Sequence, residues 1–250
     1  MTTPYPKQNH LLASLPEAVF KRWLPQLELV HLTLGQVLYE PGGTMSHAYF
    51  PTTSIVSMLY VMINGESAEI AVVGGEGLIG VPLFMGGDST NSRAVVQNAG
   101  PAYQLAAAVL KKEFLEVPVF HLLLRYTQAL ISQTVQTAAC NKHHTLEQQL
   151  SRWLLLSLDR LPSNELIMTP QLIANMLGVK QPIVREAERK LQADGLIRYE
   201  DGRITVLNRT DLEKVSCECY LAVKREYDRL LPEVARDADD LSQQAVTTIP

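Results

Sequence analysis

The sequence predicts an α+β protein in which an N-terminal antiparallel β-roll, of the double-stranded jelly-roll type, precedes a long helix and a C-terminal region of short helices and a hairpin. Three observations predict this order. Short apolar runs alternate with turn residues from Val30 to about Leu105. An apolar spacing of three and four residues then continues through 118–142. Finally, 169–206 holds two short amphipathic segments separated by a glycine, followed by an Asp-Gly turn.

Composition sets the class of protein. The chain has 250 residues, of which 46% are hydrophobic and 19% charged, as in ordinary globular proteins with room for two domains. Its three cysteines are too few for a disulfide scaffold and fit a reducing compartment. No apolar stretch reaches the about 18 to 20 residues that span a bilayer, and MTTPYPKQNH does not resemble a signal peptide. We therefore expect a cytoplasmic protein without a membrane partner.

The net charge is −4, with the acidic excess at the two ends of the chain. Residues 118–215 carry a small excess of basic side chains, which permits contact with nucleic acid without requiring it.

The first predicted domain covers 1–117. Residues 11–28 form a short helical pair that is broken by Pro16 and Pro25. In the roll that follows, Asn64-Gly65 predicts a hairpin with a two-residue turn. The spacing of Gly75, Gly77 and Gly80 fits GxGxxG, but a dinucleotide fold needs a long helix directly afterwards. VPLFMGGDSTNS follows instead, so a turn of the roll is favoured.

The second predicted unit is a helix over 118–145. A coiled-coil-like seam follows a 4-3-4-4-3 spacing and consists of Phe120, Leu124, Thr127, Ile131, Val135 and Ala138. We expect this seam to pair with a second copy of the chain, because a long helix between two domains has few other surfaces to cover it. The alternative is that the helix packs on the core of its own domain.

The third predicted domain covers 146–231 and begins with a helix around Leu146–Leu161. Thr169 is a good helix N-cap, and Pro170 suits the first helical position. Gly178 provides the tight turn before a second helix, whose inner face is predicted to be Ile183, Val184, Ala187 and Leu191. Two short strands joined by Asp201-Gly202 complete a winged helix-turn-helix. One more helix is expected from about Asp211 to Leu231, and 232–250 is expected to be an acidic flexible tail.

The outward face of the second helix in this motif is rich in side chains that bind double-stranded DNA. Arginine suits guanine, and glutamine suits adenine. The predicted base-reading residues are Gln181, Arg185 and Glu186, and the predicted phosphate contacts are Thr169, Gln171, Lys180, Arg189 and Arg203. The alternative is a solvated helix whose charges pair along its own surface.

Over about 15–215, the chain resembles the Crp–Fnr superfamily of bacterial transcription regulators. The resemblance rests on GLIGVPLF and SRAVVQ, and above all on TPQLIANMLGVKQPIVREAERKLQADGLI. It implies a homodimer that binds a pseudo-palindromic operator and that, as an activator, contacts RNA polymerase. It also implies an effector pocket at Gly80, Val81, Arg93 and Ala94.

Within that pocket, Val81 stands where the family's ribose-binding glutamate would be. We therefore expect DNA binding without cyclic AMP, and we leave open an anionic nucleotide effector bound through Arg93. The alternative for Arg93 is a surface ion pair.

No catalytic residues are predicted, because the chain lacks G-x-S-x-G, H-E-x-x-H and G-x-x-x-x-G-K-[ST], so an enzyme is not expected. No metal ligands are predicted either. Cys217-Glu-Cys219 is too closely spaced for a typical zinc pair, and His143-His144 is favoured as a polar helix end over a metal or haem site. The alternative function is a small-molecule-sensing signalling module whose helix-turn-helix binds protein and not DNA.

Overall fold

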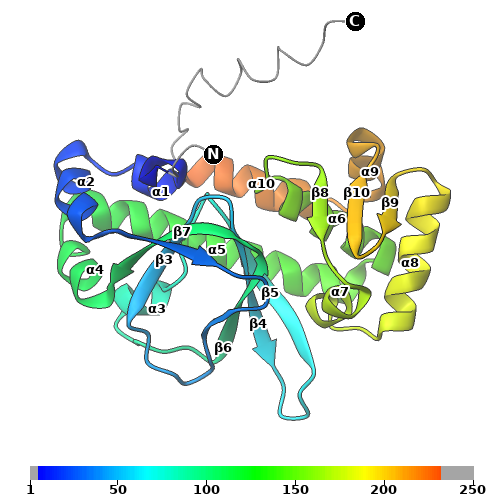
Figure 1. The fold of residues 1–250 in the computed structure, drawn as a ribbon, viewed down its shortest axis with the longest axis horizontal. Coiled ribbons are helices and arrows are strands. Elements are labelled where there is room, and N and C mark those ends of the chain that lie inside the picture. The colour runs from blue at the N-terminus through cyan, green and yellow to red at the C-terminus, as the bar shows by residue number, and fades with distance from the viewer. Residues whose placement is uncertain (1–4, 232–250) are drawn as a thin grey trace, which may run out of the picture.

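The computed structural model describes residues 5–231 and shows the predicted order of roll, long helix and winged helix-turn-helix (Figure 1). The predicted acidic tail at 232–250 lies outside the described residues. Within 5–231, no helix is both long enough and apolar enough to cross a membrane.

The N-terminal segment forms the helical pair that its prolines predict. Short 3-10 turns at Pro6–Gln8 and Leu24–Gln26 flank α1 (His10–Ala13) and α2 (Glu17–Trp23). Asn9 anchors the pair, because its Oδ1 accepts from the backbone of α1 while its Nδ2 donates to the carbonyls of Pro51 and Gly77. A buried Asn9 thus attaches the first helices to the roll.

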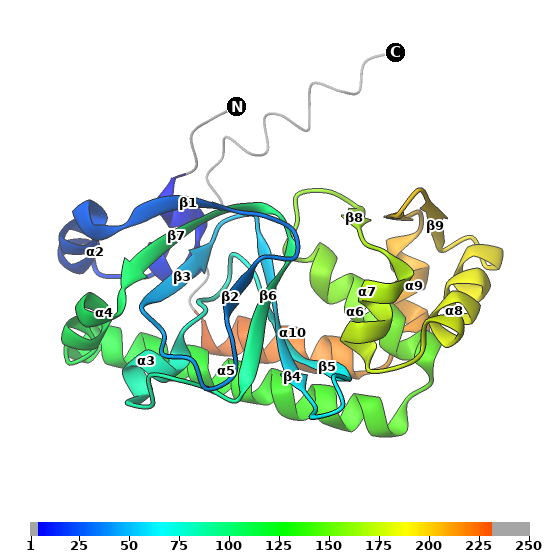
Figure 2. The same cartoon turned by 60° about the horizontal axis from the view of Figure 1, so that its bottom comes forward.

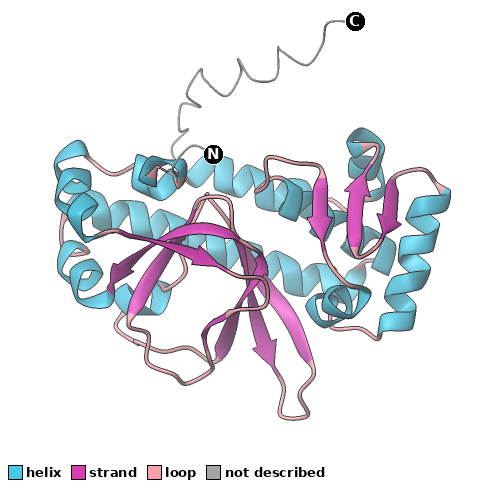
Figure 3. Cartoon of the chain, in the orientation of Figure 1, coloured by secondary structure: helices cyan, strands magenta, loops and turns pink. Residues whose placement is uncertain are grey.

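The roll consists of two antiparallel sheets, visible as the larger group of strands in Figure 3. One sheet has the order β1-β7-β3 and the other has the order β2-β6-β4-β5. The strands are β1 (Glu28–Leu32), β2 (Val37–Tyr39), β3 (His47–Pro51), β4 (Ile55–Val61), β5 (Ser67–Val73), β6 (Ser92–Asn98) and β7 (Gly100–Ala106).

The β4–β5 hairpin is present, but its turn differs from the prediction. Met62 N donates to Glu66 O at 2.7 Å, and Gly65 N donates to Met62 O at 2.9 Å. The loop therefore has three residues, with Gly65 in the left-handed region at φ +84°. Asn64-Gly65 located the turn correctly, whereas the two-residue length was wrong.

The glycine-rich segment 75–80 is a turn of the roll, as predicted. A side chain at Gly77 would meet the Tyr126 ring, because a Cβ built there lies 2.5 Å from the Tyr126 hydroxyl oxygen. That hydroxyl donates to Leu78 O at 2.8 Å. The turn thereby joins the roll to the long helix α5 (Val117–His143).

Helices cover the roll on one side. The remaining helices of this half are α3 (Val81–Met85) and α4 (Ala107–Glu113), and α6 (Leu146–Leu158) follows α5 directly. Figure 2 shows α5 running the length of the molecule, with α10 (Cys219–Leu230) beside it.

Most of the predicted seam on α5 is exposed in the single chain. Phe120, Leu124, Ile131 and Val135 are exposed by 38%, 41%, 56% and 63%, and Ala138 is exposed as well. Thr127 is the exception, since it is only 6% exposed and donates to Leu123 O. Its assignment to the seam was wrong. The exposed side chain one residue further along is Gln128.

The C-terminal region contains β8 (Glu165–Ile167), α7 (Pro170–Leu177), α8 (Gln181–Ala193), β9 (Ile197–Glu200), β10 (Arg203–Val206) and α9 (Arg209–Val215). The wing is a three-stranded antiparallel sheet of order β8-β10-β9, so β8 adds a strand to the two that were predicted. The predicted single helix after Asp211 is two helices, because Ser216 is extended at ψ 157° and α10 begins only at Cys219.

The helix-turn-helix contacts the roll through the β4–β5 hairpin. Ser67 Oγ donates to Asn175 O on α7 at 3.3 Å. A Cβ built on Gly178 lies 3.1 Å from the Ala68 Cβ. The turn between α7 and α8 thus lies directly on β5.

Candidate nucleic-acid interface

The turn between α7 and α8 has the local geometry that the sequence predicts. The Thr169 side chain accepts from Leu172 N at 3.2 Å, and Pro170 follows at the first helical position. Gly178 ends α7 at φ +66°, a conformation that costs a glycine little and a side chain more. The first helix is therefore capped at both ends, which fixes where α8 starts.

The orientation of α8 is set by its buried side chains. Val184, Ala187 and Leu191 are at most 2% exposed and pack in the core. Ile183 is 47% exposed, so its assignment to the inner face was wrong. The reason is helical phase, because a stripe through 184, 187 and 191 leaves position 183 at its margin.

The outward face of α8 presents the predicted base-reading side chains. Arg185 and Glu186 are exposed, and Gln181 is half-buried at the first turn. A hollow of about 470 Å³ lies between this face and the wing, lined by Pro170, Pro182, Arg185, Glu188, Arg189, Gln192 and Tyr199. Arg185 therefore borders both the free surface of α8 and a recess beside it.

Glu188 lies on the floor of this recess. It is 3% exposed, and its Oε1 has no hydrogen-bond partner among the described residues. Burial raises the pKa of its carboxyl to about 7, and the nearby charge of Arg185 opposes that rise. Sequence reasoning missed Glu188 as a feature of the site, although it lies one position after a predicted buried residue.

The predicted phosphate contacts differ in how free they are. Lys180 is exposed at the start of α8, and Arg189 is exposed with its Nε donating to Arg185 O. Thr169 uses its hydroxyl as the helix cap, and Gln171 donates to Asn175 Oδ1 at 2.9 Å. The five side chains surround the motif, but only some of them have uncommitted donors.

Arg203 is already paired inside the wing. Its Nη1 donates to Glu165 Oε2 at 2.6 Å, across the pairing of β10 with β8. The sequence did not reveal this partner because Glu165 belongs to the strand that was not predicted.

The predicted effector pocket shows a committed arginine. Arg93 Nε donates to Glu40 Oε2 at 2.7 Å, and both side chains are partly exposed. The alternative ion pair is therefore the arrangement that the structure shows. Gly80 has φ +120° and lies against Ala48, Val81 begins α3 with 9% exposure, and Ala94 is fully buried in β6.

A second group of side chains comes together away from α8. The structure brings Cys140, His144, Cys217 and Cys219 within reach of one another, although the sequence predicted no metal ligands there. The sequence could have predicted this group only if the packing of the end of α5 against the start of α10 had been known.

Comparison with known proteins identifies the motif. Residues 148–215 match the family profile described as a Crp-like helix-turn-helix domain. No curated protein matches the chain.

Several solved structures share the fold. A putative transcriptional regulator of the Crp/Fnr family from Eubacterium rectale is 17% identical with a TM-score of 0.66, covering 84% of this chain and 98% of its own. FixK2 from Bradyrhizobium japonicum is 17% identical with a TM-score of 0.66, covering 76% and 98%. The c-di-GMP-responsive global regulator CLP from Xanthomonas campestris is 14% identical with a TM-score of 0.61, covering 77% and 100%.

The profile match lies on the elements that form the candidate interface, since it begins in α6 and ends with α9. The solved structures extend the likeness of fold to the roll and the long helix. The chain therefore contains a Crp-like helix-turn-helix domain over 148–215, and its fold resembles that of solved transcription regulators of the Crp/Fnr family.

Proposed function

We propose that the protein acts as a homodimer, in which two copies of α8 enter successive major grooves of a pseudo-palindromic operator. The observation that carries this is the exposed apolar stripe on α5, where Ile131 and Val135 are more than half exposed in the single chain. Exposed apolar stripes at heptad spacing bury themselves against a second helix. In this assignment, 118–145 is the dimerisation helix and 146–231 is the DNA-binding domain.

The role of 1–117 is that of a sensor that does not depend on cyclic AMP. Two features support this: Val81 offers no carboxylate to a ribose hydroxyl, and Arg93 is bound to Glu40 at 2.7 Å. An unpaired buried polar group costs about 1–3 kcal/mol, which is enough to remove a nucleotide at cellular concentrations. An anionic effector, such as the cyclic dinucleotide in the name of the CLP regulator, would have to compete with Glu40 for Arg93.

The expected role is regulatory and not catalytic. Its partners are double-stranded DNA and a second copy of the chain, with RNA polymerase as a third partner where the protein activates transcription.

Selection from random DNA tests this proposal. The purified full-length protein is incubated with a random library without nucleotide, and the bound DNA is sequenced. We expect an enriched motif with two inverted halves whose centres are about 10 base pairs apart. Enrichment of a single half-site would contradict the dimeric arrangement, and no enrichment would favour the signalling module whose helix-turn-helix binds protein.

Calorimetry with cyclic AMP tests the sensor assignment. We expect no binding tighter than about 100 μM, which corresponds to about −5.5 kcal/mol. A low-micromolar dissociation constant that Arg93→Ala abolishes would overturn the proposed independence from cyclic AMP.

A further inference from the structure

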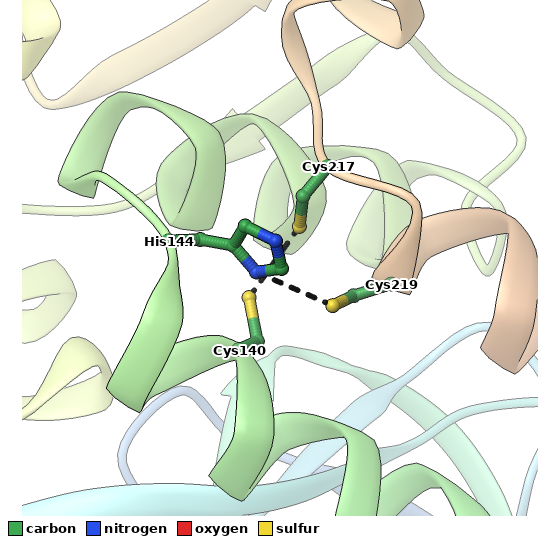
Figure 4. Close-up of side chains that lie close together, drawn as sticks. All are labelled: Cys140, His144, Cys217 and Cys219. Atoms are coloured by element: carbon green, nitrogen blue, oxygen red, sulfur yellow. Dashed lines mark hydrogen bonds between the residues drawn. The ribbon is translucent and has the colours of Figure 1, made fainter.

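Three thiols and an imidazole converge where the end of α5 meets the start of α10 (Figure 4). Cys140 lies in the last turn of α5, and His144 is the residue that follows the helix. Cys217 lies in the break between α9 and α10, and Cys219 is the first residue of α10. The four potential ligand atoms all lie within 4.8 Å of one another. Residues far apart in the sequence thus supply one compact set of donors.

The spacing of these atoms suits a single tetrahedral ion. The Sγ atoms of Cys140 and Cys217 are 3.5 Å apart, and so are Cys219 Sγ and His144 Nδ1. Zinc bonds of about 2.3 Å to sulfur and about 2.0 Å to nitrogen place neighbouring ligands of a tetrahedron about 3.5 to 3.8 Å apart. An iron–sulfur cluster would hold its thiolates farther apart, because several atoms lie between them. The pocket therefore has the size of one ion.

The three thiols are buried, and the His144 side chain is 17% exposed. Cys140, Cys217 and Cys219 are 0%, 4% and 1% exposed, and all three are free thiols. Thiolate and imidazole are the ligands that zinc prefers. Four protein ligands leave no open position for water or substrate, which is the arrangement of structural zinc sites and not of catalytic ones.

Outer groups orient two of the four ligands. Glu218 Oε2 lies 3.3 Å from His144 Nε2, on the opposite side of the ring from Cys219. A carboxylate at one ring nitrogen fixes the tautomer that leaves the other nitrogen free to bind a metal. Gln136 Nε2 also donates to Cys219 Sγ at 3.0 Å. This second layer of contacts is typical of metal-binding histidines and cysteines.

A buried cation lies beside the cluster. Arg152 on α6 is 3% exposed and its Nε has no hydrogen-bond partner among the described residues, while its Nη1 reaches Thr137 Oγ1 at 3.3 Å. Its charge acts electrostatically on the Cys140 thiol. A buried charge is costly unless an opposite charge lies near it. Zinc with three thiolates carries a single net negative charge, which would offset that of Arg152.

We propose that Cys140, His144, Cys217 and Cys219 bind one Zn²⁺ ion that fastens the end of α5 to the segment between α9 and α10. Binding releases the three thiol protons and leaves the neutral His144 coordinated through Nδ1. Because Cys217 follows the last helix of the winged helix-turn-helix, the ion ties the DNA-binding region to the long helix. The bond lies beside the α5–α6 junction and restricts its bending.

Metal content and a cobalt spectrum test the site. The full-length protein is purified without an affinity tag, in a buffer without chelator, and its metals are measured by mass spectrometry. We expect about one zinc per chain. After exchange for Co²⁺, we expect the visible bands of tetrahedral cobalt together with charge transfer from sulfur. This spectrum is read on the wild-type chain, so it does not depend on the folding of any variant.

Matched variants locate the ligands. His144→Ala and Cys219→Ser should lose most of the zinc and the cobalt bands, whereas His143→Ala, at the exposed neighbouring position, should keep both. In the wild type, zinc should raise the temperature of unfolding by several degrees and a chelator should reverse this rise, with no such response in Cys219→Ser.

Three results would overturn the proposal. They are zinc content far below one per chain and equal in wild type and Cys219→Ser, an octahedral cobalt spectrum, and a Cys140–Cys217 disulfide in the freshly purified protein.

Discussion

Arg185 is an exposed side chain of α8 that lines the recess next to the wing, and it forms no ion pair with another side chain among the described residues. We expect Arg185→Ala to weaken binding to the selected operator by about 1–3 kcal/mol, because a bidentate contact to guanine is lost. Binding to random DNA should fall far less. Titrations of both DNAs measure the difference, with Arg225→Ala on α10 as a control that removes the same charge elsewhere. Equal losses on both DNAs would show that Arg185 contacts only phosphate.

Glu69 connects the stability of the roll to pH. It is fully enclosed in β5, where burial raises the pKa of its carboxyl to about 7, against the opposing effects of the Ser57 hydroxyl at 2.6 Å and the charge of Arg152. The folded state therefore retains a proton that the unfolded chain releases near pH 4.5. The contribution of Glu69 to folding stability is therefore greatest below that pH and falls as the pH rises towards 7.

The corresponding prediction concerns Glu69→Gln, which keeps the shape of the side chain and cannot ionise. In the wild type, the unfolding free energy should fall by up to about 3 kcal/mol between pH 5 and pH 8, which follows from the size of the pKa shift. The Glu69→Gln variant should not show this fall. Denaturant titrations at both pH values measure this. Glu66→Gln, in the exposed hairpin loop, serves as the control. If the unfolding free energies of wild type and Glu69→Gln depend on pH in the same way, the Glu69 carboxyl ionises in the folded protein without loss of stability.

Five exposed large apolar side chains lie on α5 in the single chain: Val117, Phe120, Leu124, Ile131 and Val135. Ile131→Asp or Val135→Asp places a charge in the proposed dimer contact, where an unpaired charge is costly. We expect monomers in sedimentation experiments and loss of binding to the two-half operator. Both positions are exposed in one copy, so the variants should fold. Arg125→Asp lies about a quarter-turn away on the same helix and should stay dimeric. Intact dimers in both seam variants would place the interface elsewhere.

The same helix shows what periodicity can and cannot predict. Spacings of three and four residues identified α5 and most of its exposed stripe, because a helix repeats every 3.6 residues. They did not decide between Thr127 and its neighbour Gln128, since both fit the period within one step. The Thr127 hydroxyl binds the Leu123 carbonyl and faces the chain's own core. For a polar residue at the margin of an apolar stripe, hydrophobic periodicity does not show whether the side chain faces the core or the solvent.

Short elements depend on partners that a local pattern lacks. β8 has only three residues and exists because Leu166 pairs with Ile204 on β10. Thr169, Gly178 and Asp201-Gly202 were predicted correctly, because capping and positive φ are local requirements. The Arg203–Glu165 pair was not, because it needed the missing strand.

At the scale of the whole molecule, DNA binding must overcome a net charge of −4. Binding therefore depends on a few local cations and should weaken steeply as salt increases. We expect Lys180→Ala, which removes an exposed cation at the start of α8, to lower the slope of log affinity against log salt by about 0.9. Arg203→Ala should change the slope less, since Glu165 already neutralises that side chain. An unchanged slope for Lys180→Ala would remove it from the phosphate contacts.

The cysteine–histidine cluster marks the limit of sequence reasoning at this scale. Cys140 and Cys217 meet only because the chain turns after α9 and α10 runs back along α5 (Figure 1). Neither Cys217-Glu-Cys219 nor His143-His144 has a metal-binding spacing by itself. The packing of α10 against α5 brings these side chains together, and no short sequence motif predicts that packing.

The contact of β5 with α7 also affects how the helix-turn-helix can be exchanged between proteins. Ser67 and Ala68 of β5 contact α7 and the turn at Gly178. The helix-turn-helix therefore packs on a strand of the roll, which lies outside its own domain. A chimera that joins this helix-turn-helix to the roll of another regulator would inherit a mismatch at that surface unless the hairpin is transplanted with it. For such a graft, the unit to exchange is the helix-turn-helix together with the β4–β5 hairpin.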